Sequence, residues 1–226
     1  VYTKEGILDI DRMAPKFLER KEEELSNQAE IAVAAAKKAM AAADKRPEDI
    51  DAVIVSCAYT QRAYPAIAIE VQKELGIDGF AFDMLMACSA ATFGLHRAFD
   101  SLKAGSARCV LAINPELVTP QVNYCDRDSH FIFGDVSCAV IMETEKTCTV
   151  DSPFEVRSTK AFTRFSNNIR SNFVHMSRST FCYPYVFVIL FHQSRRTVFE
   201  QVSPVAADPI REHLALHAIE PCSVTR

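Results

Sequence analysis

The feature that most constrains the fold is an apolar run that ends at a cysteine and is followed by a helical pattern. The run Gly79–Met86 is short and rich in aromatic residues, which predicts a buried strand. It stops at Ala87-Cys88-Ser89, after which small residues open a helical pattern that continues to Lys103. We therefore expect Cys88 on a turn between a strand and a helix.

A thiol in this position has two interpretations. An arbitrary free cysteine is most often a small buried hydrophobic residue. At the start of a helix, the backbone N–H groups and the helix dipole favour the thiolate, which is the nucleophilic form. The same N–H groups are suited to holding a developing oxyanion. We predict that Cys88 is catalytic, and that the small residues after it, such as Ala90 and Gly94, let the helix pack closely.

Strands and helices alternate before Cys88. Ser26 is placed to cap a helix that runs to about residue 43, and the nearly continuous apolar run 51–58 is typical of a strand in a covered parallel sheet. A helix over 66–75 then ends at Gly76. Strand, helix and the Cys88 strand form a βαβ unit, which predicts an α/β fold with a right-handed crossover.

Two further strand regions follow the Cys88 helix. Residues 109–114 predict another buried strand, and residues 115–128 a polar loop. Residues 131–143 predict two short strands, broken at Gly134-Asp135.

Composition excludes several functional classes. The 226 residues are 49% hydrophobic, enough for a sizeable core, and the net charge of −4 argues against a general nucleic-acid binder. Eight cysteines are scattered without a CxxC pair, which indicates core thiols in a reducing cytoplasm and no metal site. The longest apolar run, 181–191, is too short to span a bilayer and contains Pro184, so we expect no membrane anchor.

Three segments carry a family resemblance. In order, ACSAATFG, SLKAGSARCVLAINPE and RDSHFIFGDVSCAVIME resemble the N-terminal half of β-ketoacyl-[acyl carrier protein] synthase III, a condensing enzyme of the thiolase superfamily. The resemblance implies a layered αβαβα thiolase-like fold. Residues 1–150 would form the N-terminal half, lacking its first strand, and residues 151–226 a truncated C-terminal half.

The resemblance also implies an activity. In the family, the cysteine matching Cys88 takes an acyl group from acyl-CoA, and a later His and Asn promote the decarboxylation of malonyl-acyl carrier protein. The CoA thioester is a substrate, and no separate cofactor is implied. The substrate-binding residues are expected to be Tyr64, Met84 and Phe93. Tyr64 would lie at a homodimer interface and reach into the partner's acyl tunnel; an ordinary exposed loop aromatic remains the alternative.

Two histidines near suggestive residues are not expected to be catalytic. His130 lies beside a strand, where a structural role is more common, and the family's His comes from the second half of the fold. His192-Gln193 superficially resembles the family's His-Gln-Ala-Asn motif, but that motif should follow a helix corresponding to 206–218. The chain ends near that point, so we expect acyl transfer without condensation.

Residues between Glu155 and Glu200 include no Asp or Glu, and within them the segment 174–195 departs from the family pattern. A pair of compensating frame shifts and a genuine insertion both explain this break. Three other functions also stay open. They are a different thiolase-superfamily condensing enzyme, of the polyketide or hydroxymethylglutaryl-CoA type, an inert fragment that pairs with a full-length subunit, and, least favoured, a redox sensor.

Overall fold

The computed structural model describes residues 8–9, 14–15, 17, 19–122, 124, 126–127, 130–171 and 191–220. The chain divides into two compact units. The first comprises residues 1–119 and 134–161, and the second comprises residues 120–133 and 162–226. The predicted division into halves at residue 150 remains a prediction.

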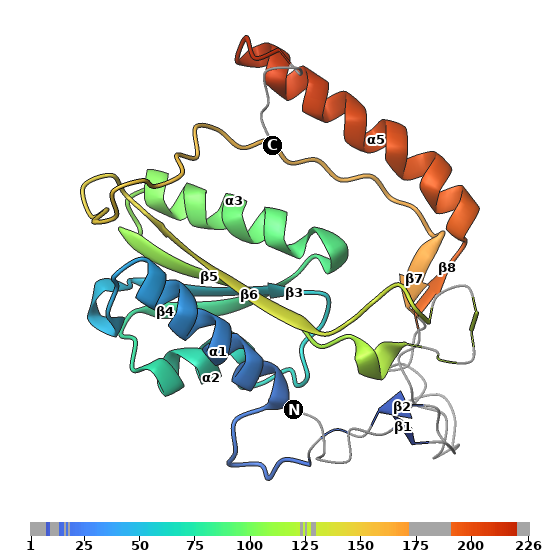
Figure 1. Cartoon of the computed structure of the whole chain (residues 1–226), viewed down its shortest axis with the longest axis horizontal. Helices are drawn as coiled ribbons and strands as arrows, with labels where there is room; N and C mark the ends of the chain where they lie inside the picture. Colours follow the sequence, from blue (N-terminus) through green and yellow to red (C-terminus); the bar gives the residue numbers. More distant parts are fainter. Residues whose placement is uncertain are drawn as a thin grey trace. The chain divides into compact units, whose positions relative to one another are not determined.

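The first unit is built on a mixed four-stranded sheet with the order β4-β3-β5-β6 (Figure 1). The strands are β3 (Ala52–Cys57), β4 (Phe80–Leu85), β5 (Cys109–Glu116) and β6 (Val136–Glu143). Both β4 and β5 run parallel to β3, whereas β6 is antiparallel to β5. The parallel pairing of β3 with β4 across a helix confirms the predicted βαβ unit and the α/β fold class.

Helices cover both faces of this sheet. Helices α1 (Asn27–Ala42) and α2 (Ile67–Leu75) lie on one face, and α3 (Ala90–Lys103) lies on the other (Figure 1). The Ser26 hydroxyl accepts a hydrogen bond from the Ala29 backbone N–H at 3.1 Å, so the predicted cap of α1 is confirmed. Gly76 ends α2 with φ +68°, as its position predicted.

The core consists of two apolar layers separated by the sheet. All six side chains of β3 are buried, which confirms a strand covered on both faces. Val53 and Val55 pack toward α1 and α2, whereas Ile54 packs toward α3. On α3, the small residues Ala90, Gly94 and Ala98 recur every fourth position and are buried. This spacing gives α3 one narrow face that approaches the sheet closely.

The prediction that β4 is a buried strand is wrong. Its side chains are half-buried or exposed, and Phe80, Phe82 and Leu85 are among the exposed large hydrophobic residues. The reason is the strand order, because β4 lies at one end of the four-stranded sheet and has a described neighbour only on the β3 side. An aromatic run predicts a strand, but the run does not reveal whether the strand is central or at an edge.

The prediction of two strands within 131–143 is also wrong. Residues 131–135 are turn and irregular structure, and a single strand, β6, begins at Val136. It pairs with β5 along its whole length, from Glu116↔Val136 to Cys109↔Glu143. The Gly134-Asp135 pair therefore ends a loop and does not interrupt a strand.

Several short elements complete the first unit. The antiparallel pair β1 (Leu8–Asp9) and β2 (Ala14–Pro15) lies near the N-terminus. Short 3₁₀ turns are η1 (Pro47–Asp49) and η2 (Ala87–Ser89). The 3₁₀ turn η3 (Thr119–Gln121) spans the boundary between the two units.

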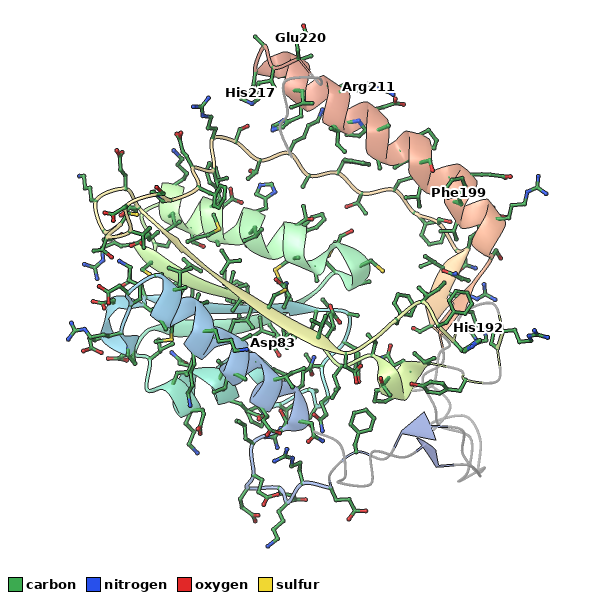
Figure 2. All side chains as sticks on the ribbon, viewed as in Figure 1. Asp83, His192, Phe199, Arg211, His217 and Glu220 are labelled. Carbon is green, nitrogen blue, oxygen red and sulfur yellow. The ribbon has the colours of Figure 1, made fainter. Side chains whose placement is uncertain are left out.

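The second unit contains an antiparallel pair, β7 (Ile169–Ser171) with β8 (Phe191–Gln193), followed by helix α5 (Arg195–Leu216). Gln201 ties α5 to the segment before β7, because its Oε1 accepts hydrogen bonds from Ser166 Oγ at 3.0 Å and Asn168 Nδ2 at 3.1 Å. Phe199 on α5 is 73% exposed (Figure 2).

Helix α5 begins earlier than the predicted helix over 206–218 and contains Pro204 and Pro209. Most of the atypical segment 174–195 lies outside the described residues, so both explanations of it remain predictions.

Candidate active site

Cys88 lies on the 3₁₀ turn η2, between the end of β4 and the start of α3. The prediction of a strand-to-helix turn is therefore confirmed, and the side chain is exposed. The preceding residue, Ala87, has φ +45°, a left-handed conformation that non-glycine residues seldom adopt. Such strained backbone clusters at functional sites, where it directs a neighbouring side chain.

Two backbone N–H groups of the turn at Cys88 donate hydrogen bonds within the turn. The Ser89 N–H donates to the Met86 carbonyl at 3.0 Å, and the Ala90 N–H donates to the Ala87 carbonyl. These two amides are already bonded within the turn, and oxyanion binding at the start of α3 remains a prediction. The dipole of the 14-residue helix α3 still places its positive end at this turn.

Close packing fixes the helix that follows Cys88. A Cβ atom added to Gly94 would lie 2.2 Å from Ser56 Oγ on β3. Ser56 is fully buried, and Asn114 Nδ2 donates to both its carbonyl oxygen and its hydroxyl oxygen at 2.9 Å. The predicted role of Gly94 in close helix packing is confirmed, and its contact is with the central strand of the sheet.

The other described cysteines differ in environment. Cys57 and Cys109 are buried, and burial raises the pKa of each thiol to about 12. Both therefore remain protonated and unreactive near neutral pH. The interpretation of the cysteines as core residues holds for these two, but Cys138 is exposed. Among described cysteines, Cys88 combines exposure with a position at a helix start.

The three predicted substrate-binding residues lie in different elements of the first unit. Tyr64 is 85% exposed, in the loop between β3 and α2. Met84 is half-buried on β4 and packs against the core layer beneath α3, together with Leu95 and Phe99. Phe93 is half-buried in the first turns of α3. Met84 and Phe93 therefore flank Cys88 along the chain, whereas Tyr64 comes from a separate loop.

Asp83 is a residue of this site region that the sequence reasoning missed. It lies on β4, and its carboxylate accepts hydrogen bonds from the backbone N–H groups of Ile67 and Ala68, both at 2.8 Å (Figure 2). The capping residue of α2, Ala66, has no side-chain oxygen, so Asp83 supplies the cap from another element. Burial raises the pKa of Asp83, whereas the two backbone hydrogen bonds oppose the rise. The sequence did offer a signal for this residue, because Asp83 is the one acidic residue inside the apolar run Gly79–Met86.

The two histidines that were set aside have structural contacts. The His130 N–H donates to the Asp126 carbonyl at 3.0 Å, and the ring packs edge-on against Phe131. His192 lies on β8, opposite Arg170 of β7 (Figure 2). Across the residues that the structure describes, no group of three or more His, Cys, Asp or Glu side chains is arranged to hold a metal ion. In the same part of the chain, no helix is long and apolar enough to cross a membrane.

Sequence comparison identifies relatives that match the whole chain or about half of it. The family model for 3-oxoacyl-[acyl-carrier-protein (ACP)] synthase III matches residues 82–157. A β-ketodecanoyl-[acyl-carrier-protein] synthase from Pseudomonas aeruginosa is 47% identical over 226 residues, which is all of this chain and 65% of the relative. A β-ketoacyl-[acyl-carrier-protein] synthase III from Chelativorans sp. is 35% identical over 119 residues, or 52% of this chain and 37% of the relative.

Solved structures share the fold. The 3-oxoacyl-[acyl-carrier-protein] synthase III from Aquifex aeolicus aligns with a TM-score of 0.64 and 25% identity, over 90% of this chain and 60% of that structure. The priming β-ketosynthase of the R1128 polyketide pathway aligns with a TM-score of 0.65 and 23% identity, over 83% of this chain and 55% of that structure. At this identity the second likeness shows the fold alone.

The strand order, the cysteine-bearing turn and these structural likenesses define an α/β chain with the thiolase-like fold of condensing enzymes, as predicted. Within that class, the chain is similar to 3-oxoacyl-[acyl-carrier-protein] synthase III enzymes over residues 82–157 and to the Pseudomonas aeruginosa relative over its whole length. It spans less than two thirds of the length of the relatives compared above.

Proposed function

We propose that this chain transfers an acyl group from acyl-CoA to Cys88, the first half-reaction of a 3-oxoacyl-[acyl-carrier-protein] synthase of fatty-acid synthesis. The observation that carries the proposal is the exposed Cys88 thiol at the start of α3, directly after the strained Ala87. Buried Cys57 and Cys109, with pKa values raised to about 12, are poor competitors for the same substrate.

The proposed transfer is a thioester exchange. The Cys88 thiolate attacks the carbonyl carbon of the acyl-CoA thioester, and a tetrahedral intermediate forms. The bond to the CoA sulfur then breaks, and the CoA thiolate leaves and takes up a proton from solvent. The positive end of the α3 dipole lies at the turn that carries the attacking sulfur. The step requires no metal and no cofactor beyond the CoA that enters with the substrate.

In the complete reaction, malonyl-acyl carrier protein is the second substrate. Loss of carbon dioxide generates an enolate that attacks the acyl-Cys88 carbonyl, forms a carbon–carbon bond and releases the Cys88 thiolate. The expectation that this chain acylates without condensing remains a prediction. Mixing the acylated chain with malonyl-acyl carrier protein and measuring 3-oxoacyl product tests it separately.

The acyl donor that we propose is octanoyl-CoA. The Pseudomonas aeruginosa relative, 47% identical over the whole of this chain, is named as a β-ketodecanoyl synthase. A ten-carbon 3-oxoacyl product results when an eight-carbon acyl group gains the two carbons that malonate contributes. Tyr64, Met84 and Phe93 are the residues proposed to contact this acyl chain. Met84 and Phe93 are half-buried and lie four residues before and five residues after Cys88, which supports that role.

The proposed partner is a second copy of the chain, in the cytoplasm. Strand β4 ends the described sheet and carries exposed Phe80 and Phe82, so it offers an apolar edge that another β4 strand can extend. Measurement of the mass in solution by light scattering tests this pairing. A Phe82→Lys variant should be monomeric, and a dimer of unchanged strength in that variant would contradict the pairing.

Intact-protein mass spectrometry after incubation with octanoyl-CoA or acetyl-CoA tests the acyl transfer. We expect an acyl-sized mass gain in the natural chain and in Cys138→Ala, which removes another exposed cysteine, but none in Cys88→Ala. Circular dichroism of each sample shows whether it is folded. If a folded sample gains no mass, or if Cys88→Ala gains as much, the proposal fails and an inert chain is the better description.

A further inference from the structure

The loop between β3 and α2 carries Tyr64 and is held at both ends by polar side chains from other elements. The first end, residues 58–62, follows β3 directly. The second end is the start of α2 at Ile67. Between them, Ala63, Tyr64 and Pro65 are exposed. The conformation of this exposed segment therefore depends on the contacts at its two ends.

Gln28 of α1 holds the first end. Its side chain is fully buried, and its Oε1 accepts a hydrogen bond from the Gln61 backbone N–H at 2.8 Å. Its Nε2 donates to the carbonyls of Tyr59 and Pro115, both at 2.9 Å. The Gln28 backbone N–H donates in turn to Gln61 Oε1 at 3.1 Å. Because an unpartnered amide is costly to bury, this complete set of bonds favours one position of the loop.

Glu70 of α2 reinforces the same end. Glu70 is buried, and its Oε1 accepts a hydrogen bond from Arg62 Nε at 2.6 Å. Its Oε2 accepts a hydrogen bond from the Ser26 backbone N–H at 2.9 Å, just before α1. Side chains of α1 and α2 therefore converge on residues 59–62, and Gln28 also bonds the end of β5.

Asp83 holds the second end. Its two carboxylate oxygens accept hydrogen bonds from the first two N–H groups of α2, Ile67 and Ala68. Asp83 lies on β4, five residues before Cys88. The strand that delivers the proposed nucleophile thus also fixes the end of the loop that carries Tyr64.

We propose that Gln28 is a positioning residue: it locks the loop after β3 so that Tyr64 is presented in one orientation, and it thereby sets the acyl-chain selectivity of transfer to Cys88. The selectivity part rests on the proposed function. The locking part rests only on the hydrogen bonds of the buried Gln28 side chain.

A matched pair of substitutions tests the proposal. Gln28→Met removes the carboxamide at nearly constant volume. Gln72→Met is the control, because Gln72 Nε2 also donates to a backbone carbonyl, that of Gly79 at 2.9 Å, but outside the loop. Circular dichroism verifies that both variants are folded at the assay temperature.

Amide hydrogen exchange measures how firmly Gln28 holds the loop after β3, and it does not depend on enzymatic activity. We expect peptides that cover residues 58–66 to exchange at least about tenfold faster in Gln28→Met than in the natural chain, since a lost net hydrogen bond is worth roughly that factor. In Gln72→Met the same peptides should be unchanged. Equal exchange of this loop in all three proteins would overturn the positioning role, whatever the activity is.

Acylation rates measure the acyl-chain selectivity of transfer to Cys88. The ratio of Cys88 acylation rates with octanoyl-CoA and acetyl-CoA should fall by about tenfold in Gln28→Met. It should stay the same in Gln72→Met. In a Tyr64→Ala background, Gln28→Met should no longer change the ratio, because its effect passes through Tyr64.

The outcomes separate the two proposals. A natural chain that is not acylated refutes the proposed function and, with it, the selectivity role. A natural chain that is acylated, with the same ratio in Gln28→Met, refutes the selectivity role alone. A ratio that changes equally with and without Tyr64 shows a general structural effect and also refutes it.

Discussion

Replacing Gly94 by alanine should destabilise the chain, although alanine is the better helix former. The added Cβ would lie 2.2 Å from Ser56 Oγ and 3.3 Å from Ser56 Cβ, inside van der Waals contact. The hydroxyl cannot turn away freely, because it accepts a hydrogen bond from Asn114 Nδ2. Relief therefore requires either a shift of α3 or the loss of that bond.

The magnitudes decide the sign of this change. Overpacking a well-filled core costs about 1–3 kcal/mol, and the loss of a buried hydrogen bond adds about 1 kcal/mol. The gain from replacing glycine in a helix interior is at most about 1 kcal/mol. We expect a net loss of about 1–3 kcal/mol in the free energy of unfolding, measured by urea titration with far-ultraviolet circular dichroism.

Gly134→Ala is the matched control, since a Cβ there meets no atom within 4 Å. Its unfolding midpoint should stay close to that of the natural chain. Adding Ser56→Ala to Gly94→Ala removes the nearest atom and should recover part of the loss. A Gly94→Ala chain as stable as the Gly134→Ala control would refute the reasoning, and so would a double variant that recovers nothing.

Three further predictions follow from the fold. Native-state alkylation near pH 8 should modify Cys88 but leave Cys57 and Cys109 unmodified, because burial raises the pKa of these two thiols to about 12. Peptide mass mapping identifies the modified residues, and equal modification of all three would contradict the burial of Cys57 and Cys109. Ser26→Ala should lower the free energy of unfolding by about 1 kcal/mol through loss of the α1 cap, and an unchanged urea midpoint would refute the cap. The pKa of Asp51 is lowered chiefly by its hydrogen bond to the Arg108 side chain, so its stabilisation is present above pH 3.8 and disappears as the pH falls through the lowered pKa. Asp51→Asn should therefore cost at most about 1 kcal/mol at neutral pH, because the pair is solvent-screened. Urea titrations should show this difference shrinking in acid, and a difference that does not depend on pH would contradict the prediction.

Local sequence signals predicted most of the elements in the first unit. The Ser26 cap, the stop at Gly76 and the βαβ order depend on interactions between residues near in sequence, so they can be read directly. The turn at Cys88 was predictable for the same reason. Burial was less accessible, because Phe80 and Phe82 predict a strand equally well at the centre of a sheet and at its edge.

Only the tertiary structure decided the long-range polar contacts. The left-handed backbone conformation of Ala87 could not be predicted from the sequence, because alanine normally avoids positive φ. The partners of Gln28 lie 31 to 87 residues away along the chain, and Asp83 caps a helix that begins 16 residues earlier. A pattern of residue types predicts which segments form helices and strands, because those hydrogen bonds are local or repetitive. Which buried amide or carboxylate meets which loop depends on how the segments pack, and only the folded chain brings those groups together.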